Sequence, residues 1–215
     1  GGIICFNRPI GGDVVRAIRK GRTFFEVLAA PGFTDEAREL LAVREKLRVM
    51  ELPADWASRR PSGRDGRRVQ GGWLVQDWDL GVDIDWKVPT DRAPTDDEAG
   101  CMRFAWAMVQ HVKSNAIVLA RAEDGGFVLN GVGAGQMSRV DSVRIAISKA
   151  TRAVQGAVLA SDAFFPFPDA VEEACEAGIR AIIQPGGSIR DDAVVDAANS
   201  AETTMVMTGA RHFRH

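Results

Sequence analysis

The sequence predicts an α/β protein built around a parallel sheet. From residue 115 onward, short apolar runs typical of buried strands alternate with segments whose apolar residues recur at helical spacing. The connections between these segments are short, which favours parallel pairing through right-handed crossovers. The chain has 215 residues, of which 46% are hydrophobic, and this is enough for a large buried core.

Residues 1–50 already alternate between strand-like and helical patterns. Strands are expected at 3–6, 24–30 and 47–52, and helices at 12–19 and from 34 toward 46. Thr34 is a suitable N-cap, because acidic residues follow it in the first turn, where the helix dipole favours them. The chain opens at Gly1 in strand-like sequence without a methionine, and we interpret it as a piece of a longer chain.

Residues 53–95 are rich in proline, glycine and arginine and read as connecting structure, with a hairpin expected at 68–79. The arginines at 59–68 are interpreted as a solvated loop. Four of the five tryptophans fall in this stretch: Trp56, Trp73, Trp78 and Trp86. They could form a face on which a cofactor stacks, or they could pack the connector against its neighbours.

A capping box formed by Thr95 and Glu98 predicts that a helix begins here. Its apolar residues recur at helical spacing: Met102, Ala105, Trp106, Val109 and Val112.

The elements that follow complete the α/β pattern. Strands are expected at 115–120 and 126–132, as a pair, and at 156–160, 179–183 and 203–208; helices are expected at 138–150 and 169–177. Gly178 provides the left-handed residue that commonly ends a helix. Ser188 is expected to cap the next helix, with Asp191 three residues on.

Three loops should meet where ligands collect in such a sheet, at the carboxyl ends of the strands. They are 131–139 (GVGAGQMSR), 161–169 (SDAFFPFPD) and 184–190 (QPGGSIR). Each enters a helix and so presents backbone N–H groups and the positive end of a dipole, and its glycines allow close approach of a ligand. This pattern predicts a site for an anionic small molecule.

Aromatic and basic residues refine that prediction. Phe164, Phe165 and Phe167 surround Pro166 at a strand end. They could stack on a planar ring, or form a hydrophobic plug under the loop. Arg211 follows the last strand and could grip a phosphate or carboxylate, or belong to a solvated tail.

Composition argues against several classes of function. The net charge of −2 provides no basic face for nucleic acid, and no apolar run is long enough for a membrane helix. Cys5, Cys101 and Cys175 are scattered, as expected for reduced thiols in the cytoplasm. Neither the H-x-E nor the P-C-x-x-C pattern of a zinc deaminase occurs, so we expect no catalytic metal.

Several motifs, taken in order, resemble one family. They are GGIICFNRP at 1–9, KSNAIV at 113–118, GAGQMSR at 133–139, SDAFFPF at 161–167, QPGGSIRDD at 184–192 and RHFRH at 211–215. The family is the bacterial bifunctional purine-biosynthesis family, which joins 5-aminoimidazole-4-carboxamide ribotide (AICAR) formyltransferase to IMP cyclohydrolase. The resemblance covers essentially the whole chain.

The resemblance implies a three-layer α/β/α, cytidine-deaminase-like subdomain without zinc at 76–215, preceded by the end of a similar subdomain at 1–75. It also implies a cytoplasmic homodimer with sites shared between subunits. Its reaction moves a formyl group from the co-substrate 10-formyltetrahydrofolate to AICAR. No nucleic acid and no membrane take part.

Site residues are carried over by matching positions. Asn115 is implied near the reacting amine and formyl group, as the one catalytic residue in this chain. The other nucleotide contacts implied are Gly1, Glu26, Phe164 and Arg211. The folate contacts implied are Arg139, Asp169 and the backbone of Ser188 and Ile189.

Two departures from the family matter. Its catalytic Lys-His motif lies upstream of the segment matching Gly1 and does not occur in this chain. Pro168 stands where the family usually has arginine. We therefore expect an enzyme fragment that retains substrate contacts without its general base; the alternative is a free-standing module that binds a folate or nucleotide without catalysis.

Overall fold

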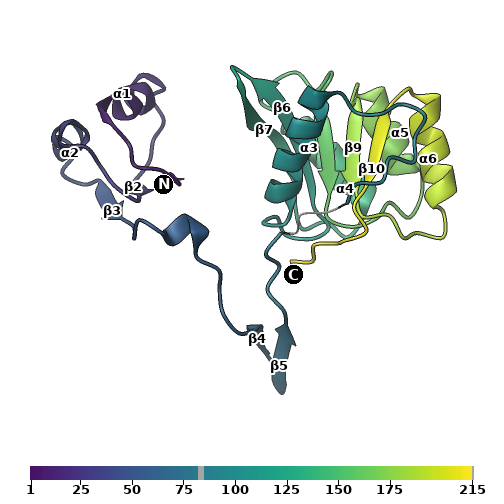
Figure 1. Cartoon of the computed structure of the whole chain (residues 1–215), viewed down its shortest axis with the longest axis horizontal. Helices are drawn as coiled ribbons and strands as arrows, with labels where there is room; N and C mark the ends of the chain where they lie inside the picture. The colour runs from purple at the N-terminus through teal and green to yellow at the C-terminus, as the bar shows by residue number, and fades with distance from the viewer. Residues whose placement is uncertain (82–84, 215) are drawn as a thin grey trace. The chain divides into compact units, whose positions relative to one another are not determined.

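The computed structural model describes residues 1–81 and 85–214, so His215 of the terminal motif lies outside the described residues. The chain forms two compact units, Gly1–Trp78 and Asp79–His215. The boundary expected from the sequence lies between residues 75 and 76. Each unit, labelled by element in Figure 1, is described by itself.

Unit 1 contains a parallel sheet in the order β1-β2-β3. Its elements are β1 (Ile3–Cys5), α1 (Gly12–Lys20), β2 (Val27–Ala30), α2 (Asp35–Ala42) and β3 (Arg48–Glu51). The Thr34 hydroxyl accepts a hydrogen bond from the Ala37 N–H at 3.2 Å, which confirms the N-cap. Helix α2 ends at Ala42, earlier than expected, because the backbone turns where the Leu47 N–H donates to the Arg44 carbonyl at 2.9 Å.

A hairpin and a short 3-10 helix, η1 (Trp56–Ser58), complete unit 1. The hairpin strands are β4 (Asp65–Val69) and β5 (Gly72–Gln76), which pair antiparallel a few residues before the expected position. Trp73 is 66% exposed and so is not packed on a core. In unit 2, Trp86 packs against the core beside α3 and lies under the Arg103 guanidinium, 4.5 Å from the ring centroid, as a connector residue would.

Unit 2 has a five-stranded sheet in the order β10-β9-β8-β6-β7. The strands are β6 (Ile117–Glu123), β7 (Gly126–Gly133), β8 (Val158–Ser161), β9 (Ala181–Gln184) and β10 (Thr204–Met207). Strands β8, β9 and β10 are parallel, whereas β6 is antiparallel to both of its neighbours. Strand β6 is thus the exception in the expected parallel sheet, and its tight hairpin with β7 through Asp124 and Gly125, both with positive φ, confirms the strand pair expected here.

Helices cover both faces of this sheet (Figure 1). One face packs against α3 (Asp96–Val109), and the other against α4 (Arg139–Ser148), α5 (Asp169–Glu176) and α6 (Asp191–Ser200). The capping box of Thr95 and Glu98 is confirmed. Gly178, at φ +91°, ends the turn after α5 as predicted. The three-layer α/β/α class is thus confirmed.

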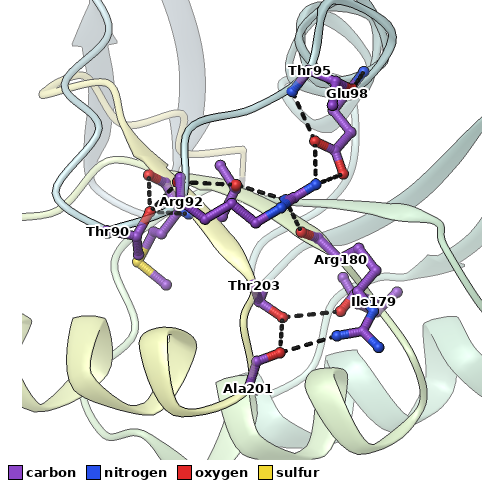
Figure 2. A network of polar contacts seen from close by, with 10 residues as sticks. Thr90, Arg92, Thr95, Glu98, Ile179, Arg180, Ala201 and Thr203 are labelled. Carbon is purple, nitrogen blue, oxygen red and sulfur yellow. Dashed lines mark hydrogen bonds and ion pairs between the residues drawn. The ribbon is translucent and has the colours of Figure 1, made fainter.

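Arg92 ties the segment before α3 to the amino ends of two strands (Figure 2). Its guanidinium donates to both carboxylate oxygens of Glu98, at 2.7 and 2.8 Å. It also donates to the Arg180 carbonyl at 3.1 Å and to the Thr204 hydroxyl at 2.7 Å. One planar cation therefore holds α3, β9 and β10 together at the edge opposite their carboxyl ends.

Replacing this cation should destabilise unit 2. We expect Arg92→Ala to lower its free energy of unfolding by about 1.5–3 kcal/mol, the usual contribution of hydrogen bonds to charged groups. Urea unfolding followed by circular dichroism measures the change. The control is Arg144→Ala, which removes an exposed ion pair to Glu173 at 2.9 Å and should cost about 0–1 kcal/mol. Equal losses in the two variants would contradict the role given to Arg92.

Two of the three thiols, those of Cys5 and Cys101, should differ in reactivity. Cys5 is exposed, whereas Cys101 is buried in α3, and burial raises the pKa of its thiol to about 11. Near pH 8, a disulfide reagent should label Cys5 quickly and Cys101 only after denaturation, since the thiolate is the reactive form. Peptide mapping after timed labelling tests this, and rapid native labelling of Cys101 would contradict the buried position of α3.

No helix in the described part of the chain is long and apolar enough to cross a membrane.

Candidate functional site

The reversed direction of β6 places Asn115 at the edge of the sheet where a ligand is expected. Asn115 lies just before β6 begins, and β6 runs opposite to β7 and β8. The start of β6 therefore lies beside the carboxyl ends of its neighbours. The loops after β7, β8 and β9 and the tail after β10 reach the same edge, as the direction of these strands requires.

A cleft of about 540 Å³ lies at this edge. It is lined by residues from before β6, from the loops after β7 and β8, from the first turns of α4 and α5, and from the C-terminal tail: Asn115, Met137, Ser138, Arg139, Val140, Ala163, Phe164, Pro166, Phe167, Asp169, Ala170 and Phe213. The structure thus brings together four residues predicted for the site, namely Asn115, Arg139, Phe164 and Asp169.

Asn115 is held by both its backbone and its amide. Its carbonyl accepts from the Ser142 hydroxyl at 2.9 Å, and its N–H donates to the Gln136 carbonyl at 3.2 Å. The side-chain Nδ2 donates to the Met137 carbonyl at 3.1 Å, and Oδ1 accepts from Arg139 at 2.8 Å. One Nδ2 hydrogen and one Oδ1 lone pair remain beyond these contacts, so the amide can both donate to and accept from a ligand.

Arg139 is buried behind Asn115. Its side chain is 7% exposed, and its guanidinium donates to Asp162 Oδ1 at 2.6 Å and to the Ser161 hydroxyl at 2.9 Å, in addition to Asn115. Asp162 was missed as a site residue from the sequence. A signal was present, because an ionisable side chain directly follows a strand whose residues are all buried, and a buried carboxylate needs a partner.

The glycines of the first loop serve packing. A Cβ on Gly131 would lie 2.1 Å from the Ala146 carbonyl oxygen, and a Cβ on Gly133 would lie 1.9 Å from that of Ser142. Both carbonyls belong to α4, so β7 needs glycine for this helix to approach it closely. The expectation that these two glycines admit a ligand is therefore wrong.

The aromatic loop divides its phenylalanines between two roles. Phe165 is fully buried in the core between the sheet and helices α4, α5 and α6, as the plug interpretation requires. Phe164 lines the cleft and is half-buried, which leaves its ring available to a planar ligand. Phe167 is 47% exposed, and the Arg190 guanidinium lies 4.6 Å from its ring centroid.

The third loop is held by its own side chains. The Asp191 carboxylate accepts from the Gly187 N–H at 2.7 Å and from the Ser188 N–H at 3.1 Å. Helix α6 begins at Asp191 with Arg190 as N-cap, so the expectation that Ser188 caps it is wrong. The physical reason is that the Ser188 hydroxyl accepts from the Arg190 N–H at 3.1 Å, before the helix begins, and so bonds no N–H group inside α6. Ile189 is fully exposed.

The C-terminal tail is anchored through Arg214. The His212 N–H donates to the Asp162 carbonyl at 2.9 Å, and its Nδ1 lies 2.7 Å from Asp79 Oδ2. Ser114 and Arg214 exchange two hydrogen bonds, at 2.9 and 3.1 Å. Arg211 is exposed, with its guanidinium 4.8 Å from the ring centroid of Phe213, a residue of the cleft. The solvated-tail alternative therefore does not hold for His212.

Gly1 and Glu26 belong to unit 1, where the Gly1 ammonium lies 3.3 Å from Glu26 Oε2. Within the described residues, no group of three or more His, Cys, Asp or Glu side chains gathers that could hold a metal ion.

A sequence model of one family, described as the AICARFT/IMPCHase bienzyme, matches residues 1–149. The chain belongs to the AICARFT/IMPCHase bienzyme family. This confirms the resemblance drawn from the motifs and indicates a role in purine biosynthesis, within a family of multifunctional enzymes that combine transferase and hydrolase activities. The matched segment includes Asn115 and Arg139 and ends before the aromatic loop.

Among solved structures, the chain is similar to a dCMP deaminase from the cyanophage S-TIM5 in its apo form. The two share 12% sequence identity with a TM-score of 0.34, over 53% of this chain and 98% of that chain.

Proposed function

We propose that this member of the bienzyme family provides substrate-binding parts of an AICAR formyltransferase, which transfers a formyl group from 10-formyltetrahydrofolate to AICAR during IMP synthesis. One observation supports this above the others. A single cleft gathers Asn115, Arg139, Phe164 and Asp169, to which the family resemblance assigns contacts with the two substrates. The cytoplasmic location and the homodimer are proposed on the resemblance alone.

The reaction needs orientation and proton removal. The 5-amino group of AICAR is a poor nucleophile, because its lone pair is delocalised into the imidazole and the carboxamide. Asn115 has one acceptor and one donor position beyond its protein contacts. We propose that Oδ1 accepts from the attacking amine while Nδ2 donates to the formyl oxygen, where negative charge develops.

The nucleotide would bind on the aromatic side of the cleft. Phe164 offers its ring to the imidazole. Arg211 supplies a planar, forked donor for the phosphate, and its stacking on Phe213 keeps the guanidinium beside the cleft. Gly1 and Glu26 are proposed as further nucleotide contacts on the resemblance.

The folate would contact a carboxylate, a guanidinium and a backbone N–H group. The Asp169 carboxylate can accept from the amide-like edge of the pterin. Arg139 has two of its five N–H donors beyond the three contacts described. Because the Ser188 N–H already donates to Asp191, we propose Ile189 as the stronger backbone contact. Pro168, the departure from the family, is the N-cap of α5 and leaves this loop without the usual arginine.

The family's Lys-His motif is missing from this sequence, so we expect the isolated 215 residues to have negligible turnover. A formyl-transfer assay that mixes the chain, AICAR and 10-formyltetrahydrofolate tests this. The full-length protein, in which we expect that motif upstream of Gly1, should be active. Robust turnover by the isolated chain would overturn the assignment of the base, and an upstream stop codon would favour a binding module without catalysis.

Arg211→Ala should weaken AICAR binding by roughly 10- to 150-fold, because a charge-assisted contact to phosphate contributes about 1.5–3 kcal/mol. Calorimetric titration of the full-length protein with AICAR measures the dissociation constant. Arg152→Ala is the matched control, since Arg152 is exposed and pairs with Glu123 at the other end of β6. Unchanged affinity in Arg211→Ala would remove this residue from the nucleotide site.

A further inference from the structure

We infer that Asp162 and Arg139 are a positioning pair that fixes which way the Asn115 amide faces the cleft, and thereby sets the rate of the reaction. The kinetic effect rests on the function proposed above. The hydrogen-bonded geometry does not depend on that function. Asp162 lies at the end of β8, Arg139 at the start of α4 and Asn115 before β6. Three elements that are distant in the sequence therefore meet in one chain of hydrogen bonds.

The pair explains why an arginine is buried here. Arg139 is 7% exposed and Asp162 only 1%, so neither charge is solvated by bulk water. Their contact at 2.6 Å compensates both charges. Asp162 Oδ2 has no hydrogen-bond partner among the described residues. The carboxylate is therefore connected to the site through the hydrogen bond between Oδ1 and Arg139.

The pair also decides the orientation of the amide. A guanidinium has only donors, so the atom of Asn115 that faces Arg139 must be Oδ1. The Met137 carbonyl only accepts, so it selects Nδ2. The remaining Nδ2 hydrogen is then available to a ligand. Without Arg139, the contact that selects Oδ1 is lost and only the Met137 carbonyl orients the amide. A flipped amide would place Oδ1, an acceptor, where the reaction needs the Nδ2 donor.

Asp162 acts one step further back. Ser161 donates to the Ala163 carbonyl at 2.7 Å and accepts from Arg139 at 2.9 Å, so it holds the guanidinium without compensating its charge. The carboxylate keeps the buried cation in this position. Among the residues that the proposed function assigns to substrate, Asp162 contacts Arg139 and not Asn115, so it is a positioning residue for the amide.

The geometric part can be tested in the 215-residue chain without substrate. Nitrogen-15 NMR would follow solvent exchange of the Asn115 side-chain amide, assigned with Asn115→Ala. We expect Asp162→Asn to accelerate this exchange roughly tenfold, the factor expected for losing one hydrogen bond. The matched control is Glu173→Gln, which also removes an acid paired to an α4 arginine, Arg144, but on the exposed surface. Equal exchange rates of the Asn115 amide in the wild type and in Asp162→Asn would overturn the inference that the pair orients this amide.

The kinetic part uses the full-length protein and a double-mutant cycle. Asp162→Asn should lower kcat roughly 10- to 100-fold, the scale of a slightly misplaced catalytic group. The dissociation constants for AICAR and folate should change less than about threefold. In an Asn115→Ala background, Asp162→Asn should have almost no further effect, because the group it positions is gone. Glu173→Gln should leave kcat unchanged.

A purely structural role predicts other results. Additive losses of kcat in the two backgrounds, or weaker binding of both substrates at constant kcat, would overturn the inference. If Asp162→Asn fails to fold, Arg139→Lys takes its place in the kcat cycle alone, because lysine keeps the charge but not the planar fork and because Arg139 is itself a proposed folate contact. A wild-type protein without formyl transfer would overturn the proposed function, while the exchange measurement would still decide whether the pair holds the amide.

Discussion

The direction of one strand governs the site of unit 2. Because β6 runs antiparallel to both neighbours, the chain enters it at the edge where the other strands end. Asn115 therefore shares an edge with the loops after β7 and β8, although more than forty residues of sequence lie between it and the aromatic loop. A parallel β6 would place Asn115 at the opposite edge of the sheet, away from these loops.

Arginine side chains have different roles at the two edges of this sheet. At the amino ends of β9 and β10, Arg92 is satisfied by Glu98, a backbone carbonyl and a hydroxyl, which suits a joint between elements (Figure 2). At the carboxyl ends, Arg139 is equally well satisfied, but one of its partners is the amide of a residue that lines a cleft. The same guanidinium chemistry thus stabilises the fold at one edge and orients a functional group at the other.

Much of the architecture was predictable from local patterns. The helix that starts at the capping box of Thr95 and Glu98, the stop at Gly178 and the strand pair around Asp124 follow from propensity and spacing alone. The errors also have local causes. The strand ends moved by a few residues, and the cap of α6 was misassigned because the hydrogen-bond partner of the Ser188 hydroxyl depends on a loop conformation that spacing does not reveal.

By itself, the sequence determined the α/β class and the family, because periodicity and motifs are local properties of the chain. It also predicted that Asn115, Phe164 and Asp169 belong to the site. Only the tertiary structure decided that β6 pairs with β8 as well as with β7, that Gly131 and Gly133 serve the packing of α4, and that Asp162 lies behind Asn115. The physical reason is that strand pairing, close helix approach and the compensation of a buried charge are contacts between distant segments. No spacing within a single segment encodes them.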